Sequence, residues 1–161
     1  MKKILIDKNL KQFKANLHCH STNSDGKLSP KELKDAYIKN GYSVIAFTDH
    51  EHIIDNSYLC DDGFVAINAA ELAIKEFPTL STLVKTDMKV THLNIYAKEP
   101  HNGDTPCYSS VADHFVSDEI KHLIRRSGED TVRVYGKEGI NKIIDECNNL
   151  GFLVCYNHPV W

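Results

Sequence analysis

Short apolar segments alternate with helix-length segments along the chain, and this alternation restricts the fold more than any other feature. The apolar segments are rich in β-branched and aromatic residues, which is typical of buried strands. They lie at residues 14–20, 43–50, 63–70, 87–97 and 152–158. Segments with helical patterning lie at 30–40, about 108–126 and about 137–149. Strands that alternate with helices predict an α/β fold with a mostly parallel sheet or barrel, because parallel neighbours need crossover connections.

The segment 30–40 carries the clearest helix boundaries. Ser29 is suited to the N-cap, and Pro30 suits the first helical position. Glu32 stands three residues after Ser29 and completes a capping box. Gly41 follows the last turn, where a residue of left-handed conformation commonly ends a helix. This punctuation predicts that the helix begins at Pro30 and stops before Gly41.

Length and charge limit the class of protein. The 161 residues fit one domain spanning 1–161, and 42% hydrophobic residues are enough to form a buried core. A net charge of -3 and a pI near 6.3 argue against a broad basic surface. We therefore expect no stable nucleic-acid partner, although a small basic pocket for a phosphate stays compatible with this charge. The oligomeric state is not indicated by any feature of the sequence.

The chain lacks the patterns that mark membrane or secreted proteins. No apolar run approaches the roughly 20 residues needed to span a bilayer. The stretch 1–13 contains lysines but not the apolar core of a secretory signal. Five cysteines with no CxxC pair form neither a disulfide framework nor a zinc-finger pattern. These features predict a cytoplasmic protein without a membrane partner.

The chemical signal begins with two histidines on the first predicted strand. His18 and His20 are two residues apart, so their rings share one face of the strand while Cys19 points to the other. Two neutral imidazoles on one face can hold a divalent ion. A chance pair on an exposed strand is the competing interpretation.

Further candidates follow the first two strands. Asp25 precedes Gly26, so it is either a metal ligand or an ordinary turn residue. His50 ends the strand 43–50, at the edge of the sheet where α/β folds place active sites. Asp49 could orient His50 through its other ring nitrogen, or could cap the following turn.

Three more candidates lie on or beside later strands. Glu71 follows an apolar run, where a carboxylate is costly to bury unless it is paired or bound to a metal. His92 lies within the alternating strand 87–97, and His158 ends the last strand. Each histidine alone is compatible with a packed or surface role. Together, five strand-associated segments each supply a His, Asp or Glu, which favours a metal site.

In order and spacing these segments resemble the polymerase and histidinol phosphatase (PHP) family. The stretch NLHCHSTNSDGKLSP followed by GYSVIAFTDH carries the specific part of the resemblance, and AAEL, HLNIY and YNHP follow in order. The family has an HxH motif with an acidic residue or His a few positions on, a TDH-type strand end, a bridging Glu and single histidines on the next two motif strands. The matching residues are His18, His20, Asp25, Asp49, His50, Glu71, His92 and His158.

The resemblance implies a distorted (β/α)7 barrel with two or three divalent metal ions, such as zinc, iron or manganese. The family ends its site with a late Asp-x-His pair, and no Asp-x-His occurs in this sequence. We therefore expect an incomplete barrel that lacks about its C-terminal third. The resemblance implies one ion at His18, His20 and Glu71 with the Asp of that missing pair, a second at Glu71, His92 and His158, and a third at Asp25 and His50 with the His of that pair.

The implied activity is hydrolysis of a phosphate ester by metal-activated water. A small phosphorylated metabolite is the favoured substrate. Phosphodiesterase or nuclease-like action on short oligonucleotides is one alternative, and a noncatalytic metal-binding module is another. No Gly-rich phosphate loop occurs, so chemistry driven by ATP is not indicated.

The remaining histidines and one cysteine are interpreted as structural or surface residues. His52 could reach the mouth of the site, but we expect an ordinary loop residue. His101 lies in a polar loop, and His114 and His122 lie on the predicted helix 108–126 as surface positions. Cys155 lies three residues before His158 on a strand, so we expect it in the core rather than paired with that histidine as a nucleophile.

Overall fold

The computed structural model describes residues 9–76 and 88–158. Residues 1–8 of the N-terminal stretch, residue 87 of the predicted strand 87–97 and Trp161 lie outside the described residues. The main elements are β1 (Ala15–Cys19), α1 (Pro30–Lys39), β2 (Val44–Phe47), β3 (Val65–Glu76), β4 (Lys89–Ala97), α2 (Lys137–Asn149) and β7 (Phe152–Asn157). Shorter elements are η1 (Ser57–Leu59), β5 (Asp104–Thr105), η3 (Ser110–Phe115), η4 (Lys121–Leu123) and β6 (Arg125–Arg126).

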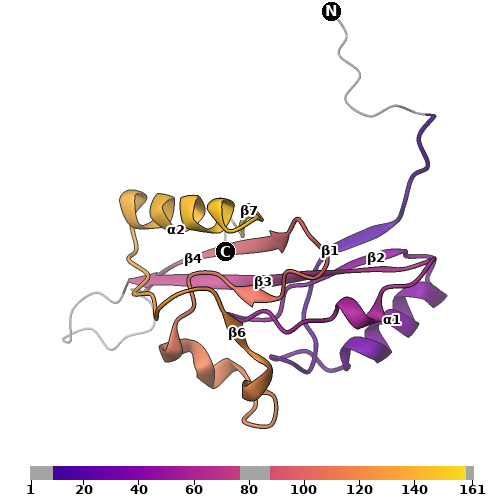
Figure 1. Ribbon diagram of the computed structural model, residues 1–161, viewed down its shortest axis with the longest axis horizontal. Coiled ribbons are helices and arrows are strands. Elements are labelled where there is room, and N and C mark those ends of the chain that lie inside the picture. Colours follow the sequence, from indigo (N-terminus) through magenta and orange to yellow (C-terminus); the bar gives the residue numbers. More distant parts are fainter. Residues whose placement is uncertain (1–8, 77–87, 159–161) are drawn as a thin grey trace, which may run out of the picture.

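The strands form one five-stranded sheet in the order β1-β2-β3-β4-β7, and β5 pairs with β6 separately. Figure 1 shows α1 beside β1 and β2, whereas α2 lies over β4 on the other side of the view. The α/β class predicted from the alternation of strands and helices is confirmed. Within the described ranges, none of the helices combines the length and apolar character that crossing a membrane requires.

The expectation of a mostly parallel sheet is wrong for half of the strand pairs. In the five-stranded sheet β1 pairs with β2 and β2 with β3 in parallel register, but β3 pairs with β4 and β4 with β7 in antiparallel register. Glu76 at the end of β3 pairs with Lys89 at the start of β4, which is the geometry of a hairpin. No helix was predicted between these two strands, and strands joined without a crossover helix run antiparallel.

The predicted boundaries of α1 are confirmed. The Ser29 side chain accepts a hydrogen bond from the Glu32 backbone N–H, and the Glu32 side chain accepts one from the Ser29 N–H. Gly41 takes a φ of 78°, the left-handed conformation expected just after a helix. α1 thereby packs Leu33 and Tyr37 against the strands that carry His18 and His50.

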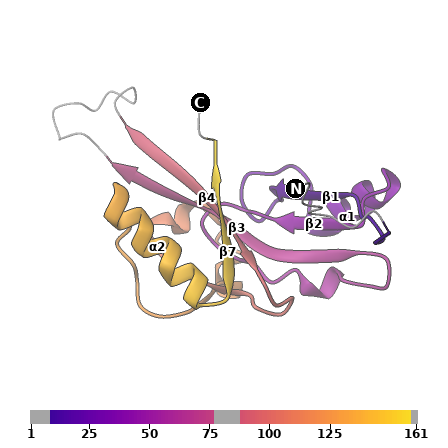
Figure 2. The same cartoon turned by 90° about the horizontal axis from the view of Figure 1, so that it is seen from above.

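Two apolar clusters cover one face of the sheet and leave the other face to the polar residues. One cluster packs α1 on β1 and β2, and the other packs Ile143 and Cys147 of α2 on β3 and β4. Ala70 and Leu72 of β3 belong to the second cluster. Glu71 lies between them, so its side chain points to the opposite face of the sheet. Figure 2 shows α2 lying along β7 on its side of the sheet.

The predicted helix at 108–126 is wrong. This segment contains the single-turn elements η3 and η4 and the short strand β6. Serine and aspartate compete with helical hydrogen bonding through their side chains. Ser110 hydrogen-bonds through both its backbone N–H and its hydroxyl to Asp130, and the Tyr108 hydroxyl donates to Asp113. These contacts fold the segment against the sheet instead of into one helix.

Two further corrections concern the later strands. The strand predicted at 63–70 continues to Glu76, so Glu71 lies inside β3 and does not follow it. Cys155 is exposed and not in the core. It lies opposite Asn94 on the outermost strand of the sheet, whose free side is not covered by any described residue of a further strand. The position of Cys155 three residues before His158 does not indicate that β7 ends the strand order of the described sheet.

Candidate metal centre

Five segments bring the predicted ligands to one face of the sheet. β1 supplies His18 and leads into His20, and the backbone beyond β2 continues beside β3 to an isolated bridge between His50 and Glu71. β4 supplies His92, and His158 follows directly after β7. The loop after β1 supplies Asp25. All seven side chains predicted as ligands therefore lie in one cluster.

Glu71 is the centre of this cluster. Its side chain is only 2% exposed, and both carboxylate oxygens face imidazole nitrogens. Oε2 lies 3.5 Å from His18 Nε2, 3.2 Å from His20 Nε2 and 3.5 Å from His50 Nδ1. Oε1 lies 3.3 Å from His92 Nδ1 and 3.1 Å from His158 Nε2. A buried carboxylate ringed by five imidazoles is a concentrated set of nitrogen and oxygen ligands.

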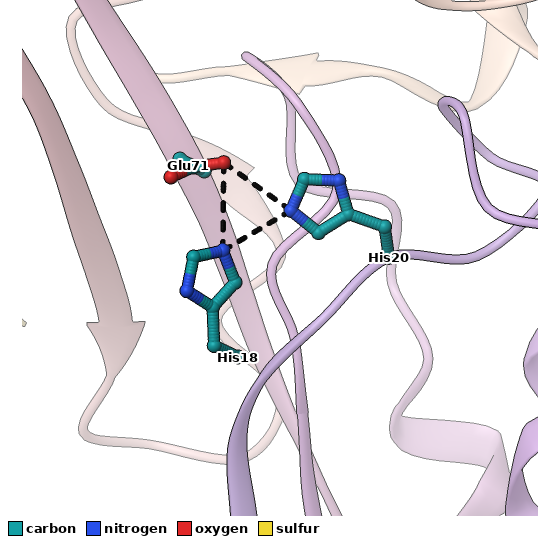
Figure 3. A group of neighbouring side chains, drawn as sticks. All are labelled: His18, His20 and Glu71. Atoms are coloured by element: carbon teal, nitrogen blue, oxygen red, sulfur yellow. Dashed lines mark hydrogen bonds and ion pairs between the residues drawn. The ribbon is translucent and has the colours of Figure 1, made fainter. Parts of the chain in front are cut away.

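The cluster divides into three overlapping groups whose ligand atoms lie within 4.8 Å of one another. Figure 3 shows the first group, in which two imidazole nitrogens converge on one oxygen of Glu71. Glu71 and His20 each belong to two groups, so the groups form one connected site. The groups are His18, His20 and Glu71; His20, Asp25 and His50; and Glu71, His92 and His158.

The spacing of these atoms fits shared metal ions. Two ligand atoms bound at about 2.1 Å to one tetrahedral ion lie about 3.4 Å apart. In the first group, His18 Nε2 and His20 Nε2 are 3.2 Å apart and lie 3.5 and 3.2 Å from Glu71 Oε2. The mixture of imidazole and carboxylate ligands suits zinc, iron or manganese. The residues present therefore fit divalent ions, with Glu71 in a bridging position.

Electrostatics within the cluster favour a proton on His20. Burial by itself raises the pKa of Glu71, but hydrogen bonds with His20 and His92 hold that pKa well below its usual range. The hydrogen bond with Glu71 raises the pKa of His20 to about 9. Burial lowers the pKa of His18 and His50. In the metal-free protein at neutral pH, His20 is therefore the charged partner of Glu71.

Metal affinity is expected to rise with pH because an ion must displace the proton of His20. The raised pKa keeps His20 protonated up to about pH 9, so the apparent affinity for Mn²⁺ should increase up to about tenfold per pH unit between 7 and 8.5. Calorimetric titration in two buffers of different ionisation enthalpy measures the released proton. His122→Asn, at an exposed histidine outside the cluster, should release the same number as the wild type. A pH-independent affinity would mean that His20 is already neutral.

Asp49 positions the loop that carries Asp25 and does not orient His50. Its carboxylate accepts hydrogen bonds from the Ser21 N–H at 2.7 Å, the Ser21 hydroxyl at 2.8 Å and the Ser24 hydroxyl at 2.9 Å. The Asp49 carboxylate faces the loop after β1, so these hydrogen bonds do not include the predicted one to the His50 ring. The Asp25 carboxylate lies with Oδ1 2.8 Å from His20 Nδ1 and with Oδ2 3.5 Å from His50 Nε2.

Gly26 allows this loop to close. Its N–H donates to the Ser21 carbonyl at 2.8 Å, and a Cβ at Gly26 would overlap the backbone carbonyl of His20. Gly26→Ala should therefore lower the free energy of unfolding by about 1–3 kcal/mol, measured by urea denaturation, and weaken metal binding as Asp25 shifts. Gly63→Ala is the matched control, because its Cβ would meet only the Asp61 side chain at 3.6 Å. Equal stability of both variants would refute the steric role.

Three residues near the cluster were not predicted from the sequence. Glu51 and Arg133 form a buried ion pair, although 82 positions separate them. Phe115 of η3 packs its ring 5.2 Å from that of His50. His52, expected as an ordinary loop residue, lies in a loop but is only 1% exposed, with Nε2 3.1 Å from Asp113. His101, His114 and His122 are exposed as expected.

Comparison with known proteins matches the PHP domain family over residues 16–152. A stretch of 45 residues is 49% identical to the DNA polymerase/3'-5' exonuclease PolX of Bacillus subtilis (strain 168), covering 28% of this chain and 8% of that protein. A stretch of 63 residues is 43% identical to a 5'-3' exoribonuclease of Haemophilus influenzae (strain ATCC 51907 / DSM 11121 / KW20 / Rd), covering 39% of this chain and 19% of that protein. The chain thus matches well under two thirds of either relative's length.

Proposed function

We propose, from the premise that the chain belongs to the PHP domain family, that it hydrolyses a phosphate ester at the seven-residue cluster. The observation that carries this proposal is the buried Glu71 carboxylate shared by two of the three potential ligand groups. A cluster built only for stability has no need to bury a carboxylate among five imidazoles. We also infer that the open sheet is one side of the distorted (β/α)7 barrel that the family resemblance implies.

Two groups of residues would each hold one ion, and Glu71 belongs to both groups. His18, His20 and Glu71 would hold one ion, and Glu71, His92 and His158 a second. When bound, divalent ions lower the pKa of water toward about 7 and neutralise charge on a phosphoryl group. Glu71 offers a different oxygen to each group, which lets one negative charge offset the repulsion between two cations. Loss of a proton from His20 readies its nitrogen for this role.

The outer group completes the site toward solvent. Asp25 is 63% exposed and lies beside His20 and His50. Together with His20 and His50, Asp25 would hold a third ion at a solvent-exposed edge of the cluster. The family's late Asp-x-His pair has no counterpart in this sequence, so the proposed ligand set consists of these seven residues. The exposed carboxylate makes this group the weakest of the three.

A small phosphomonoester is the first candidate substrate. The net charge of -3 does not favour capture of a long polyanion, whereas a compact ester needs only the cluster itself. A short oligonucleotide is the second candidate, and the names of the two relatives favour it, since both are described as exonucleases or exoribonucleases. A metal-binding module without catalysis is the third.

Metal content and hydrolysis measured together test the proposal. The purified chain is loaded with Mn²⁺ or Zn²⁺, its bound metal is quantified, and turnover of phenyl phosphate is compared with that of bis-phenyl phosphate. Metal-dependent cleavage of the monoester supports the first candidate, and preference for the diester supports the second. Bound metal with no cleavage of either ester identifies a noncatalytic module. Absence of bound metal would overturn the proposed site altogether.

A further inference from the structure

A cavity of about 620 Å³ lies beside the metal cluster, and the proposed hydrolysis does not explain it. Its volume falls in the range of small-molecule sites, roughly 300–1,000 Å³. The walls come from β3, from η3 and from residues 130–133, which precede α2. The lining includes Glu51, Ala73, Lys75, His114, Phe115 and Arg133.

The cavity continues the face of β3 on which the cluster is built. Side chains two apart on a strand share a face, so Glu71, Ala73 and Lys75 point the same way. Ala73 lies directly opposite the candidate ligand His92. Lys75 is four residues from Glu71, which is about 13 Å along a strand. The small side chain of Ala73 leaves space between the cluster and the lysine.

Phe115 is the wall that the cavity and the cluster share. One neighbour of its ring is the His50 ring, with centroids 5.2 Å apart, and another is the His114 ring, 4.2 Å away. The Lys75 ammonium lies 5.2 Å from the centre of the Phe115 ring. A group bound in the cavity therefore meets an aromatic surface directly beside a candidate metal ligand.

The charged groups of the cavity differ in how far they are already engaged. Arg133 donates to Glu51 and to the carbonyls of Cys107 and Ala73, so this pair forms a satisfied wall. Among the residues that the structure describes, no carboxylate forms an ion pair with Lys75. The Lys75 ammonium is therefore the cation of the cavity lining that can form an ion pair with an anionic group of a ligand.

We propose that this cavity holds the organic group of the ester, and that this group is a flat aromatic ring with an anionic substituent. The ring lies against Phe115, and the anion reaches Lys75, while the reacting phosphate sits at the Glu71 cluster. The inference rests on the proposed function, because that function places the phosphate. A nucleoside with a further phosphate on its sugar and an acidic aryl metabolite both combine an aromatic ring with an additional anion.

Phosphonates test the aromatic contact without any turnover, because their carbon–phosphorus bond is not cleaved. Calorimetry on the Mn²⁺-loaded protein should show that phenylphosphonate binds more tightly than butylphosphonate. Phe115→Leu keeps an apolar wall but removes the ring face, so this preference should fall about 3- to 10-fold. Phe13→Leu is the matched control, because Phe13 is 57% exposed and lies outside the cavity lining. An unchanged preference in Phe115→Leu, or no phosphonate binding at all, overturns the proposal.

A charged probe tests the lysine. 4-Phosphonobenzoate carries an additional carboxylate, so Lys75→Gln should weaken its binding about 2- to 5-fold relative to phenylphosphonate. Lys31→Gln removes a 75% exposed lysine on α1 and should change neither affinity. Equal losses for both probes in Lys75→Gln would contradict a contact with the substituent.

Two natural sources of the ring are separated by a second pair of uncleavable ligands. If the phosphonate analogue of adenosine monophosphate loses more affinity than that of ribose 5-phosphate in Phe115→Leu, the cavity accepts a nucleobase. If only phenylphosphonate responds, the cavity accepts an aryl group. Failure of the two proposals is distinguishable. Esters hydrolysed without any effect of Phe115→Leu refute the cavity alone, whereas ring-dependent binding without hydrolysis refutes the activity alone.

Discussion

Replacing Glu71 by Gln is expected to reduce bound metal and to lower kcat/KM for a phosphate ester by a factor on the order of 10³. The amide keeps the shape of the carboxylate but not its charge. Glu71 belongs to two ligand groups, and its two oxygens face five imidazoles. Without the negative charge, two divalent ions this close together repel each other without compensation. The loss should therefore affect both ions.

Metal analysis of dialysed protein and steady-state kinetics measure this effect. Glu76→Gln is the matched control, because Glu76 lies on the same strand but is half-exposed and pairs only with Lys89 in the described structure. That variant should retain metal and activity. If Glu71→Gln kept its full metal content with normal kcat/KM, the carboxylate would be a buried partner of His20 and not a ligand.

The local elements were predictable because their signals are short-range. The capping box at Ser29 and Glu32 fixes the start of α1 through contacts within four residues. The apolar periodicity of 137–149 likewise gives α2 its observed bounds. Such patterns depend little on the rest of the chain. The same holds for His18 and His20, whose shared direction follows from strand geometry alone.

The direction of the later strands and the path of 108–126 depend on tertiary contacts. The antiparallel direction of β4 fits the lack of a predicted helix between β3 and β4, but the alternation of residues within a strand does not give its partner or register. Ser110 is held by Asp130, twenty residues away, and this contact competes with a helix. The expected helix rested on local patterning, whereas the hydrogen bonds that compete with it join residues far apart in the sequence.

The candidate site was predictable as a set of residues but not as an arrangement. The order of His and carboxylate residues along the strands placed seven side chains at one face, and the structure brings them together around Glu71. Their ligand role remains a proposal. Asp49 was misassigned because its partners, Ser21 and Ser24, lie in a loop whose path no pattern specifies.

The ion pair of Glu51 and Arg133 is expected to contribute strongly to the stability of the fold. Their side chains are 3% and 5% exposed, and Arg133 also donates to the carbonyl oxygens of Cys107 and Ala73. Glu51 has a φ of 71°, an uncommon conformation for a residue with a side chain. Its N–H donates to the Glu71 carbonyl at 2.9 Å, so the pair fixes the backbone directly after His50.

Arg133→Met is expected to lower the free energy of unfolding by about 3–5 kcal/mol, because it leaves the Glu51 carboxylate buried without its cation. Urea denaturation of the metal-free protein measures the loss, and Arg126→Met, at an exposed arginine, should cost far less. The double variant Glu51→Gln/Arg133→Met removes both charges and should recover part of the loss. If the losses of Arg133→Met and of Glu51→Gln alone simply add in the double variant, the pair does not interact in solution. If they do not add, Arg133 stabilises the fold through Glu51 and so holds the backbone that places His50 beside Glu71.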